Sequence, residues 1–250
     1  MLREPTIEKL HALRLRVLAN AWLEQDKSPD TLALSFDERL ALLVDAEALA
    51  RENARLARNL REAKLRMTEA CLEGVDFPRE RQLDKAVVRQ LASCRWVTEH
   101  QTVIVTGATG TGKSYLACAL AHQACRKGFR AIYRRVPRLF DELRLARADG
   151  SHARLLTRLA KVDVLVLDDF AIGPLTEDAR RDLLEILEDR YALRATIMTS
   201  QLKHERWHDF LGDPTVADAI CDRVLHGAHK IALHGPSRRK PKETSATTKD

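Results

Sequence analysis

The chain has 250 residues, of which 45% are hydrophobic and 31% charged, so it can bury one α/β core with a smaller appendage. Its five cysteines form no CxxC pair and its apolar stretches are too short to cross a bilayer, which excludes a disulfide-stapled miniprotein and a membrane-spanning protein. The 42 Lys and Arg exceed the 36 Asp and Glu, and this net charge of +6 favours nucleic acid as a partner, although a solvated surface gives a similar excess. Because the first residues lack the apolar core of a signal peptide, we predict a cytoplasmic protein.

Residues 1–73 are predicted to form a small all-helical domain that interacts with a partner or with DNA. Apolar residues at helical spacing predict a helix over 6–22 and a longer helix over 36–67, which a capping box at Ser35–Glu38 opens. One side of the longer helix collects leucines, namely Leu42, Leu49, Leu56 and Leu60. The opposite side collects arginines that either face solvent or contact DNA or an acidic partner, namely Arg51, Arg55 and Arg58.

Residues 74–236 are predicted to form the main domain, beginning with a lead-in helix over 80–96. From residue 101 onwards β-rich runs alternate with helical segments, and the predicted strands are 102–106, 129–133, 162–167, 195–199 and 230–233. Between them, one helix is predicted to end at 127, more than one helix lies within 137–160, one helix covers 177–191 and a helical pair lies within 203–227. This alternation indicates an α/β fold with a parallel five-stranded sheet flanked by helices. The basic tail over 237–250 is predicted to be disordered.

A phosphate-binding loop follows the first predicted strand and opens a helix. It matches the GxxxxGK[ST] pattern in full, with the residues Gly107, Ala108, Thr109, Gly110, Thr111, Gly112, Lys113 and Ser114. The glycines allow backbone N–H groups to surround a phosphate, and the helix N-terminus adds positive potential. In this motif the lysine reaches the β- and γ-phosphates and the serine hydroxyl binds Mg²⁺. The sequence therefore predicts that the chain binds a nucleoside triphosphate together with Mg²⁺.

Two consecutive carboxylates follow the strand predicted at 162–167. A buried parallel strand delivers the residue at its carboxyl end to the edge of the sheet where the phosphate-binding loop lies. We therefore predict that Asp168 binds Mg²⁺ and that Asp169 orients or deprotonates the attacking water.

The remaining motifs separate the classes of protein that carry such a loop. The sequence has no NKxD motif for guanine and no LSGGQ motif of transporter ATPases. A small-molecule kinase remains a remote alternative, because the interval that usually holds an Arg-rich lid is acidic here. The chain instead resembles the AAA+ ATPases, in particular the bacterial helicase loaders and transposition helpers typified by DnaC and IstB. The resemblance covers about residues 35 to 240 and is carried by the segments GATGTGKSYLACALAHQA, VLVLDDFAIGPL, IMTSQLKHERWHDFLGDPTVADAICDRVLHGAHKI and GPSRR.

The resemblance implies an AAA+ fold, ATP as the nucleotide and three further roles. Thr199 matches the sensor-1 position, where a polar side chain detects the γ-phosphate or orients water. Arg223 matches the arginine finger, which acts on the nucleotide of a neighbouring subunit. Arg239 matches the sensor-2 arginine. The alternatives one or two residues away from these positions are Ser200, Gln201 and Arg238.

A basic region between the second and third predicted strands is the candidate DNA-binding surface. Residues 126–147 contain eight basic and two acidic residues, and the candidate contacts are Arg126, Lys127, Arg130, Arg134, Arg135 and Arg138. Because no aromatic platform for base stacking accompanies them, we expect phosphate contacts with little sequence specificity. A solvated helix face is the alternative interpretation.

Among the proteins of this branch, the chain resembles the transposition helper more closely than the loader in the run from Met198 to Arg239. The resemblance implies an ATPase that forms head-to-tail oligomers with shared ATP sites, engages duplex DNA and assists a transposase. Two alternatives remain, a DnaC-like loader of a replicative helicase and a nucleotide-gated binding module with negligible hydrolysis. The second arises because Asp169 is one methylene shorter than the Glu found there in many AAA+ proteins, so we expect hydrolysis to be slow and to depend on assembly or DNA.

Overall fold

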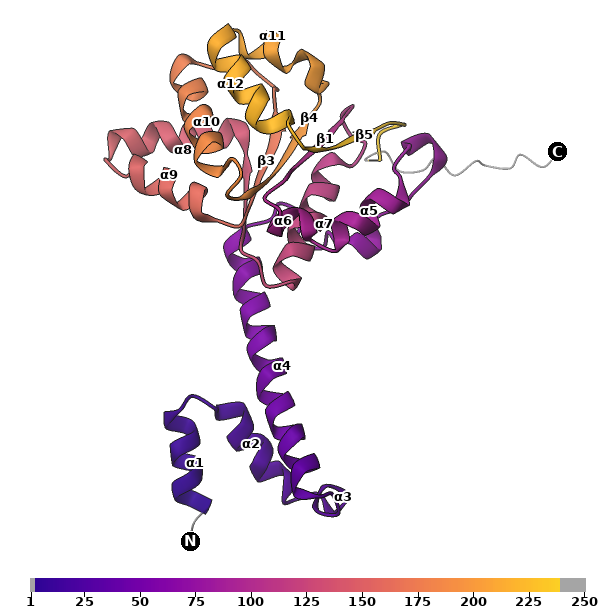
Figure 1. Ribbon diagram of the computed structural model, residues 1–250, viewed down its shortest axis with the longest axis vertical. Helices are drawn as coiled ribbons and strands as arrows, with labels where there is room; N and C mark the ends of the chain where they lie inside the picture. Colours follow the sequence, from indigo (N-terminus) through magenta and orange to yellow (C-terminus); the bar gives the residue numbers. More distant parts are fainter. Residues whose placement is uncertain (1–2, 239–250) are drawn as a thin grey trace, which may run out of the picture. The chain divides into compact units, whose positions relative to one another are not determined.

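The computed structural model describes residues 3–238, and the chain forms two compact units that divide between Arg58 and Asn59 (Figure 1). Residues 59–73, which the sequence assigned to the amino-terminal domain, belong to the second unit, because Asn59 donates hydrogen bonds to the carbonyl oxygens of Gly128 and Phe129. The boundary between the two units thus lies within a continuous helix, where the periodicity of the sequence gives no signal. Within residues 3–238 no helix is long and apolar enough to span a bilayer.

The first unit consists of helices α1 (Arg3–Ala12), α2 (Arg16–Gln25), α3 (Pro29–Leu32) and the first part of α4 (Phe36–Ala63). The single helix predicted over 6–22 is therefore two helices, and Arg14 lies between them with a φ of 62°. The predicted capping box is confirmed, since the backbone N–H of Glu38 donates to Ser35 Oγ at 3.3 Å and that of Ser35 donates to Glu38 Oε2 at 2.9 Å. The amino-terminal region is helical, as predicted.

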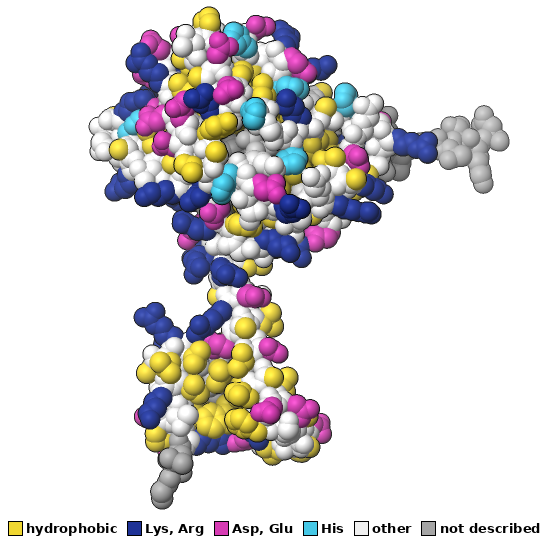
Figure 2. Space-filling model, viewed as in Figure 1, with side chains coloured by type: hydrophobic (Ala, Val, Ile, Leu, Met, Phe, Trp, Pro, Cys, Tyr) yellow, Lys and Arg dark blue, Asp and Glu magenta, His cyan; other side chains and the backbone are white. Residues whose placement is uncertain are grey.

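Apolar side chains of the first unit are exposed to an unusual extent. Within the described chain, ten of the fourteen large hydrophobic side chains that are exposed lie in this unit, and Figure 2 shows them as a broad yellow surface. Leu42 and Leu49, expected on the packed side of α4, are 49% and 60% exposed, whereas Leu43 and Glu47 are buried. Glu47 accepts hydrogen bonds from the backbone N–H of Leu18 and from Arg51, so a paired carboxylate occupies part of the packed side.

The second unit contains the predicted five-stranded parallel sheet, whose strand order is β2-β3-β4-β1-β5. The strands are β1 (Thr102–Gly107), β2 (Ala131–Arg135), β3 (Val164–Phe170), β4 (Ala195–Ser200) and β5 (His229–Leu233). Successive side chains of a strand point to opposite faces. On one face Ile104, Leu165 and Met198 join a core that the following helices cover, and on the other face Val103, Val105 and Val166 are buried beneath α7 (Lys113–Arg126).

Helices flank both faces of this sheet (Figure 1). On the face of α7 lie α5 (Lys85–Ala92) and α6 (Arg95–Thr98). On the other face lie α8 (Val136–Ala148), α9 (His152–Lys161), α10 (Glu177–Arg190), α11 (Trp207–Leu211) and α12 (Pro214–Leu225). Three short 3₁₀ turns complete the unit, namely η1 (Leu72–Gly74), η2 (Arg79–Arg81) and η3 (His204–Arg206).

Several predicted helices end or divide where the backbone adopts a positive φ. The long helix ends at Ala63 and not at residue 67, because Lys64 has a φ of 51°. The lead-in helix starts at Lys85, capped by Asp84, and is interrupted at Cys94, whose φ is 62°. Gly150, with a φ of 77°, separates α8 from α9. The predicted disorder of the tail concerns residues that lie, beyond Arg238, outside the described chain.

Arg190, the last residue of α10, is 1% exposed and ties the starts of two strands together. Its guanidinium donates hydrogen bonds to Thr196 Oγ1 and to the carbonyl oxygens of Leu159, Val162 and Ala195. These carbonyls belong to the end of α9 and to the segments that enter β3 and β4. A buried arginine that satisfies several backbone acceptors is costly to replace, because each acceptor then loses its donor in a low-dielectric interior.

We therefore expect Arg190→Met to lower the free energy of unfolding by about 3 kcal/mol, measured by urea denaturation followed by circular dichroism. The control is Arg181→Met on the same helix, because the Arg181 side chain is 67% exposed and pairs with Glu177 one turn away. We expect that change to cost less than about 0.5 kcal/mol. Equal losses in the two variants would contradict the structural role of Arg190.

Candidate nucleotide-binding site

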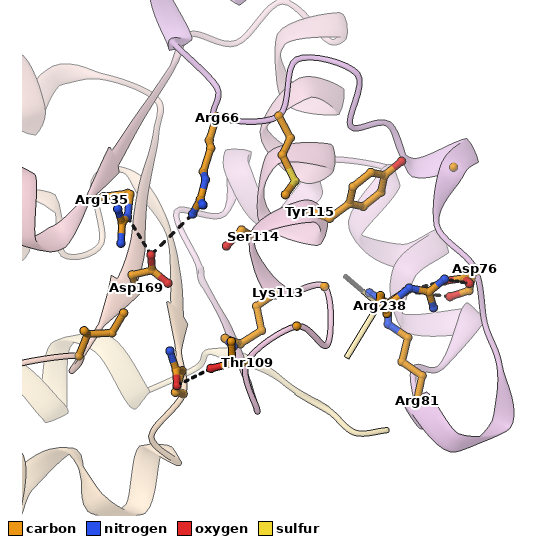
Figure 3. Close-up of a pocket in the computed structure, with 16 residues that line it drawn as sticks. Arg66, Asp76, Arg81, Thr109, Lys113, Ser114, Tyr115, Arg135, Asp169 and Arg238 are labelled. Atoms are coloured by element: carbon orange, nitrogen blue, oxygen red, sulfur yellow. Dashed lines mark hydrogen bonds and ion pairs between the residues drawn. The ribbon is translucent and has the colours of Figure 1, made fainter. Parts of the chain in front are cut away.

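A cavity of about 440 Å³ lies at the carboxyl edge of the sheet, beside the amino terminus of α7 (Figure 3). Its walls come from the phosphate-binding loop, from the segment between α4 and α5, and from the residues that end or follow β2, β3 and β4. Arg238, at the end of the described chain, closes one side. The structure thus brings together the two motifs that the sequence placed on separate strands.

The phosphate-binding loop has the conformation that its glycines permit. Gly110 and Gly112 have φ values of 88° and 93°, and a Cβ atom on Gly110 would lie 2.1 Å from Ser237 Oγ. Lys113 is only 6% exposed and donates from Nζ to the carbonyl oxygen of Ala108 at 2.9 Å, so the loop closes around its own lysine. Backbone N–H groups at a helix amino terminus and a buried ammonium make a site for phosphate.

Ser114 and Asp168, the predicted magnesium ligands, are in contact. Ser114 Oγ donates to Asp168 Oδ1 at 2.9 Å, although the two residues are 54 positions apart. Asp168 is fully buried, and it also accepts hydrogen bonds from the hydroxyls of Tyr133 and Thr199, each at 2.5 Å. Burial, together with the neighbouring Asp168, raises the pKa of Tyr133 above its ordinary value, so its hydroxyl stays a donor. A hydroxyl and a carboxylate oxygen side by side are suitable ligands for Mg²⁺.

Asp169 lies on the wall of the same cavity but is already engaged by arginines. Its Oδ2 accepts a hydrogen bond from Arg135 Nε at 2.8 Å and lies 3.7 Å from Arg66 Nη1 (Figure 3). Asp169 has a φ of 63°, and its backbone N–H donates to Thr199 Oγ1 at 3.0 Å. The carboxylate predicted to act on water therefore points into the cavity with two cations beside it.

The three polar residues considered for the sensor-1 role have different surroundings. Thr199 is fully buried; its hydroxyl donates to the Asp168 carboxylate and accepts a hydrogen bond from the backbone N–H of Asp169. Ser200 is also fully buried and donates to the carbonyl oxygen of Phe170. Gln201 lines the cavity and accepts a hydrogen bond from Thr109 in the phosphate-binding loop at 2.8 Å. Thr199 is thus placed to hold the Asp168 carboxylate and the Asp169 backbone, and Gln201 is the one of the three that faces the cavity.

Other cavity residues carry no motif in the sequence. Arg66 follows α4 in an irregular segment, and no local pattern could have indicated its place. Arg135 could have been found, because it ends β2 and the carboxyl ends of parallel strands share one edge. Tyr133 in β2 is buried, and its hydroxyl donates to Asp168.

The basic residues predicted to contact DNA do not form one strip. Those at the amino end of β2 are Arg126, Lys127 and Arg130, and those at or after its carboxyl end are Arg134, Arg135 and Arg138. Arg135 lies farthest from the predicted role, because it lines the cavity and its partner there is Asp169. Arg126 pairs with Glu73 and Arg134 with Glu142, so part of the excess positive charge is balanced locally.

Arg223 lies away from this cavity, at the opposite edge of the sheet. It lines a smaller hollow of about 200 Å³ together with Thr102 and Thr196, which are at the amino ends of β1 and β4. Its Nη2 is 2.8 Å from Glu188 Oε1, and its guanidinium lies 5.9 Å from the ring centre of Tyr191. Arg239, the predicted sensor-2 residue, lies outside the described residues, whereas its alternative Arg238 lines the nucleotide cavity.

Comparison with known proteins agrees with this geometry. Residues 8–246 match the family model described as IstB-like ATP binding protein. The chain belongs to this family. It is 48% identical over 240 residues to an insertion sequence ATP-binding protein of Sinorhizobium fredii, a match that covers 96% of this chain and 98% of the relative. It is also 50% identical over 202 residues to an insertion sequence ATP-binding protein of Pseudomonas fluorescens, covering 81% and 87% of the two chains.

Solved structures establish the fold of this IstB-like protein. The crystal structure of DnaI has a TM-score of 0.57 at 24% identity, covering 66% of this chain and 91% of DnaI. The replication initiator DnaA, solved with AMPPCP and single-stranded DNA, has a TM-score of 0.57 at 20% identity, covering 67% and 50%. The predicted AAA+ fold and the predicted family are therefore confirmed, and the family is one of ATP-binding proteins.

Proposed function

We propose that this protein is an ATPase that assists a transposase by engaging target DNA, and that it acts as a head-to-tail oligomer with shared ATP sites. The observation that carries the proposal is the separation of Arg223 from the nucleotide cavity of its own subunit. An arginine at the opposite edge of the sheet is suited to act on the nucleotide of a neighbour. The curated relatives support the biological setting, because they are ATP-binding proteins of insertion sequences.

The residues of the site divide the work of hydrolysis. Lys113 and the backbone N–H groups that follow Gly110 bind the phosphates, while Ser114 and Asp168 would hold Mg²⁺, which neutralises phosphate charge when bound. Asp169 orients the attacking water and accepts its proton. Arg223 of a neighbouring subunit adds positive charge at the transferred phosphoryl group.

The arginines beside Asp169 support slow hydrolysis that depends on assembly or DNA. Asp169 Oδ2 already accepts a hydrogen bond from Arg135 at 2.8 Å, so Arg135 competes with the attacking water for this oxygen. Asp169 becomes an effective base only when Arg135 exchanges it for another partner. We infer that a neighbouring subunit or a DNA phosphate promotes this exchange by offering Arg135 another partner.

Two surfaces support the proposed macromolecular partners. In the first unit, exposed apolar side chains gather on the face that Figure 2 shows and form a surface suited to a protein, which we assign to the transposase. In the second unit, Lys127 and Arg138 are exposed, and neither has a carboxylate among the described residues within ion-pair distance. Such cations suit DNA phosphates and carry little sequence preference.

The experiment that tests the proposal measures duplex DNA binding by fluorescence anisotropy and assembly by sedimentation velocity, both with ATP and Mg²⁺. We expect assembly on DNA that requires ATP, differs little between DNA sequences and weakens by about 10³-fold or more between 50 and 200 mM salt, as for a protein with several phosphate contacts. The same assay with added transposase is expected to give a larger complex. A monomer without salt-sensitive DNA binding, or ATP-dependent binding to a replicative helicase in place of the transposase, would overturn the proposal.

A further inference from the structure

A buried arginine beside the phosphate-binding loop has donors that the protein itself does not use. Arg81, the last residue of η2, is 3% exposed. Its Nη1 donates to the carbonyl oxygen and to Oδ1 of Asp76, at 2.9 and 3.1 Å. Its Nε is buried and has no hydrogen-bond partner among the described residues. Leaving a charged donor unpaired in the interior is costly, so this arrangement calls for a partner of another kind.

Arg81 lies directly against the amino terminus of α7. It lines the same cavity as Lys113, and its Nη2 is 2.8 Å from the point that a Cβ atom on Gly112 would occupy. Gly112 precedes Lys113 and caps this 14-residue helix. Only a residue without a side chain lets the guanidinium approach the loop so closely. The free donors of Arg81 therefore adjoin the backbone N–H groups that bind phosphate.

The charge around Arg81 also favours an anion. Arg238 pairs with the second carboxylate oxygen of Asp76, so one carboxylate serves two guanidinium groups and leaves a net positive charge. Arg238 also donates from its backbone N–H to the carbonyl oxygen of Gly110 at 2.9 Å, which places this group against the loop. Burial lowers the pKa of Arg81, and the nearby Arg238 acts in the same direction.

We propose that Arg81 is a nucleotide-binding residue whose Nε and Nη2 donate to a phosphate that ADP and ATP have in common. In Figure 3, Arg81 and Asp169 lie at opposite ends of the cavity with Lys113 between them. The end at Ser114 and Asp169 is the one equipped for Mg²⁺ and water, so Arg81 serves the phosphates nearer the nucleoside. This inference depends on ATP binding alone, which the family establishes, and stands apart from the proposed role in transposition.

The test compares Arg81→Met with Arg79→Met, a change at an exposed arginine of the same turn. Affinities for ADP and ATP are measured by isothermal titration calorimetry, and melting temperatures are measured with and without ADP. We expect Arg81→Met to weaken both nucleotides by the same factor, about 10- to 100-fold, which is the usual effect of removing a charge-assisted hydrogen bond. Because the substitution also removes a buried cation with unpaired donors, the melting temperature without nucleotide is expected to stay the same or rise.

Arg81→Lys provides the second variant, since it keeps the charge but loses the two-pronged geometry. We expect it to bind both nucleotides with an affinity between those of the wild type and Arg81→Met. A structural role would instead lower the melting temperature without nucleotide while nucleotide affinity stayed within about threefold of wild type. That result, a loss confined to ATP, or an equal loss in Arg79→Met would overturn the assignment.

Discussion

Lys113→Ala is expected to lower the affinity for ATP by about 100-fold or more. The lysine is buried and donates at 2.9 Å to the loop carbonyl of Ala108, so it is held inside the phosphate-binding loop before any phosphate contact. When ATP binds, Lys113 exchanges a neutral carbonyl for charged phosphate oxygens, and such charge-assisted hydrogen bonds are the stronger ones. Isothermal titration calorimetry with ATP and Mg²⁺ measures the loss.

The matched control for this prediction is Lys127→Ala, because Lys127 is exposed and follows the last turn of the same helix. It is expected to bind ATP as the wild type does. Circular dichroism spectra of the two variants should superimpose, which would show that α7 is intact in both. If Lys113→Ala bound ATP within tenfold of wild type, the assignment of the cavity as the nucleotide site would be wrong.

Arg223→Ala is expected to keep ATP affinity within about twofold while reducing DNA-stimulated turnover by about 10³- to 10⁵-fold, the range found for arginine fingers. Binding is retained because Arg223 does not line the cavity around Lys113. Turnover is lost because the neighbouring subunit no longer supplies its cation. Phosphate release, measured with saturating DNA, distinguishes a loss of turnover from a loss of binding. Arg181→Ala serves as the control, since Arg181 also pairs with a glutamate of α10.

Mixing two inactive variants gives a sharper test of the shared site. Subunits with Arg223→Ala keep a nucleotide site, and subunits with Lys113→Ala keep the arginine. If the arginine acts between subunits, a mixture of the two is expected to recover part of the wild-type turnover, because some interfaces combine both intact parts. No recovery in a mixture that assembles would show that Arg223 acts within its own subunit or not at all.

Local patterns predicted the parts of this molecule that depend on neighbours in the chain. The eight residues from Gly107 to Ser114 determine their own loop, because positive φ angles at Gly110 and Gly112 and the start of α7 are local properties. Alternating β-rich and helical runs likewise predicted all five strands. The interruptions at Arg14 and Cys94 were missed, because each is a non-glycine residue in the left-handed region with no turn signal.

The candidate site was predicted only where a motif lies on a strand or loop. The sequence placed Ser114 and Asp168 at one magnesium site, and the structure brings them into contact, since strand ends and the loop share the carboxyl edge of the sheet. The contact of Arg135 with Asp169 was not predicted, because a count of basic residues does not show that one of them ends β2 beside Asp169. The cavity-facing position of Gln201 beyond the end of β4 likewise depends on the loop at Thr109, 92 residues away in the chain.

The sequence by itself determined the family, the phosphate-binding loop, the order of the strands along the chain and the two carboxylates. Each of these depends on residues that lie close together in the sequence. Only the tertiary structure decided which arginines line the cavity around Lys113. Arg66, Arg81, Arg135 and Arg238 come from four separate segments and meet at one cavity, whereas Arg223 lies at the opposite edge of the sheet. In a chain with thirty arginines, composition cannot distinguish the arginines of the cavity from the others. The distances to Asp169, Asp76 and Gly112 distinguish them, because electrostatic interactions depend on separation and burial.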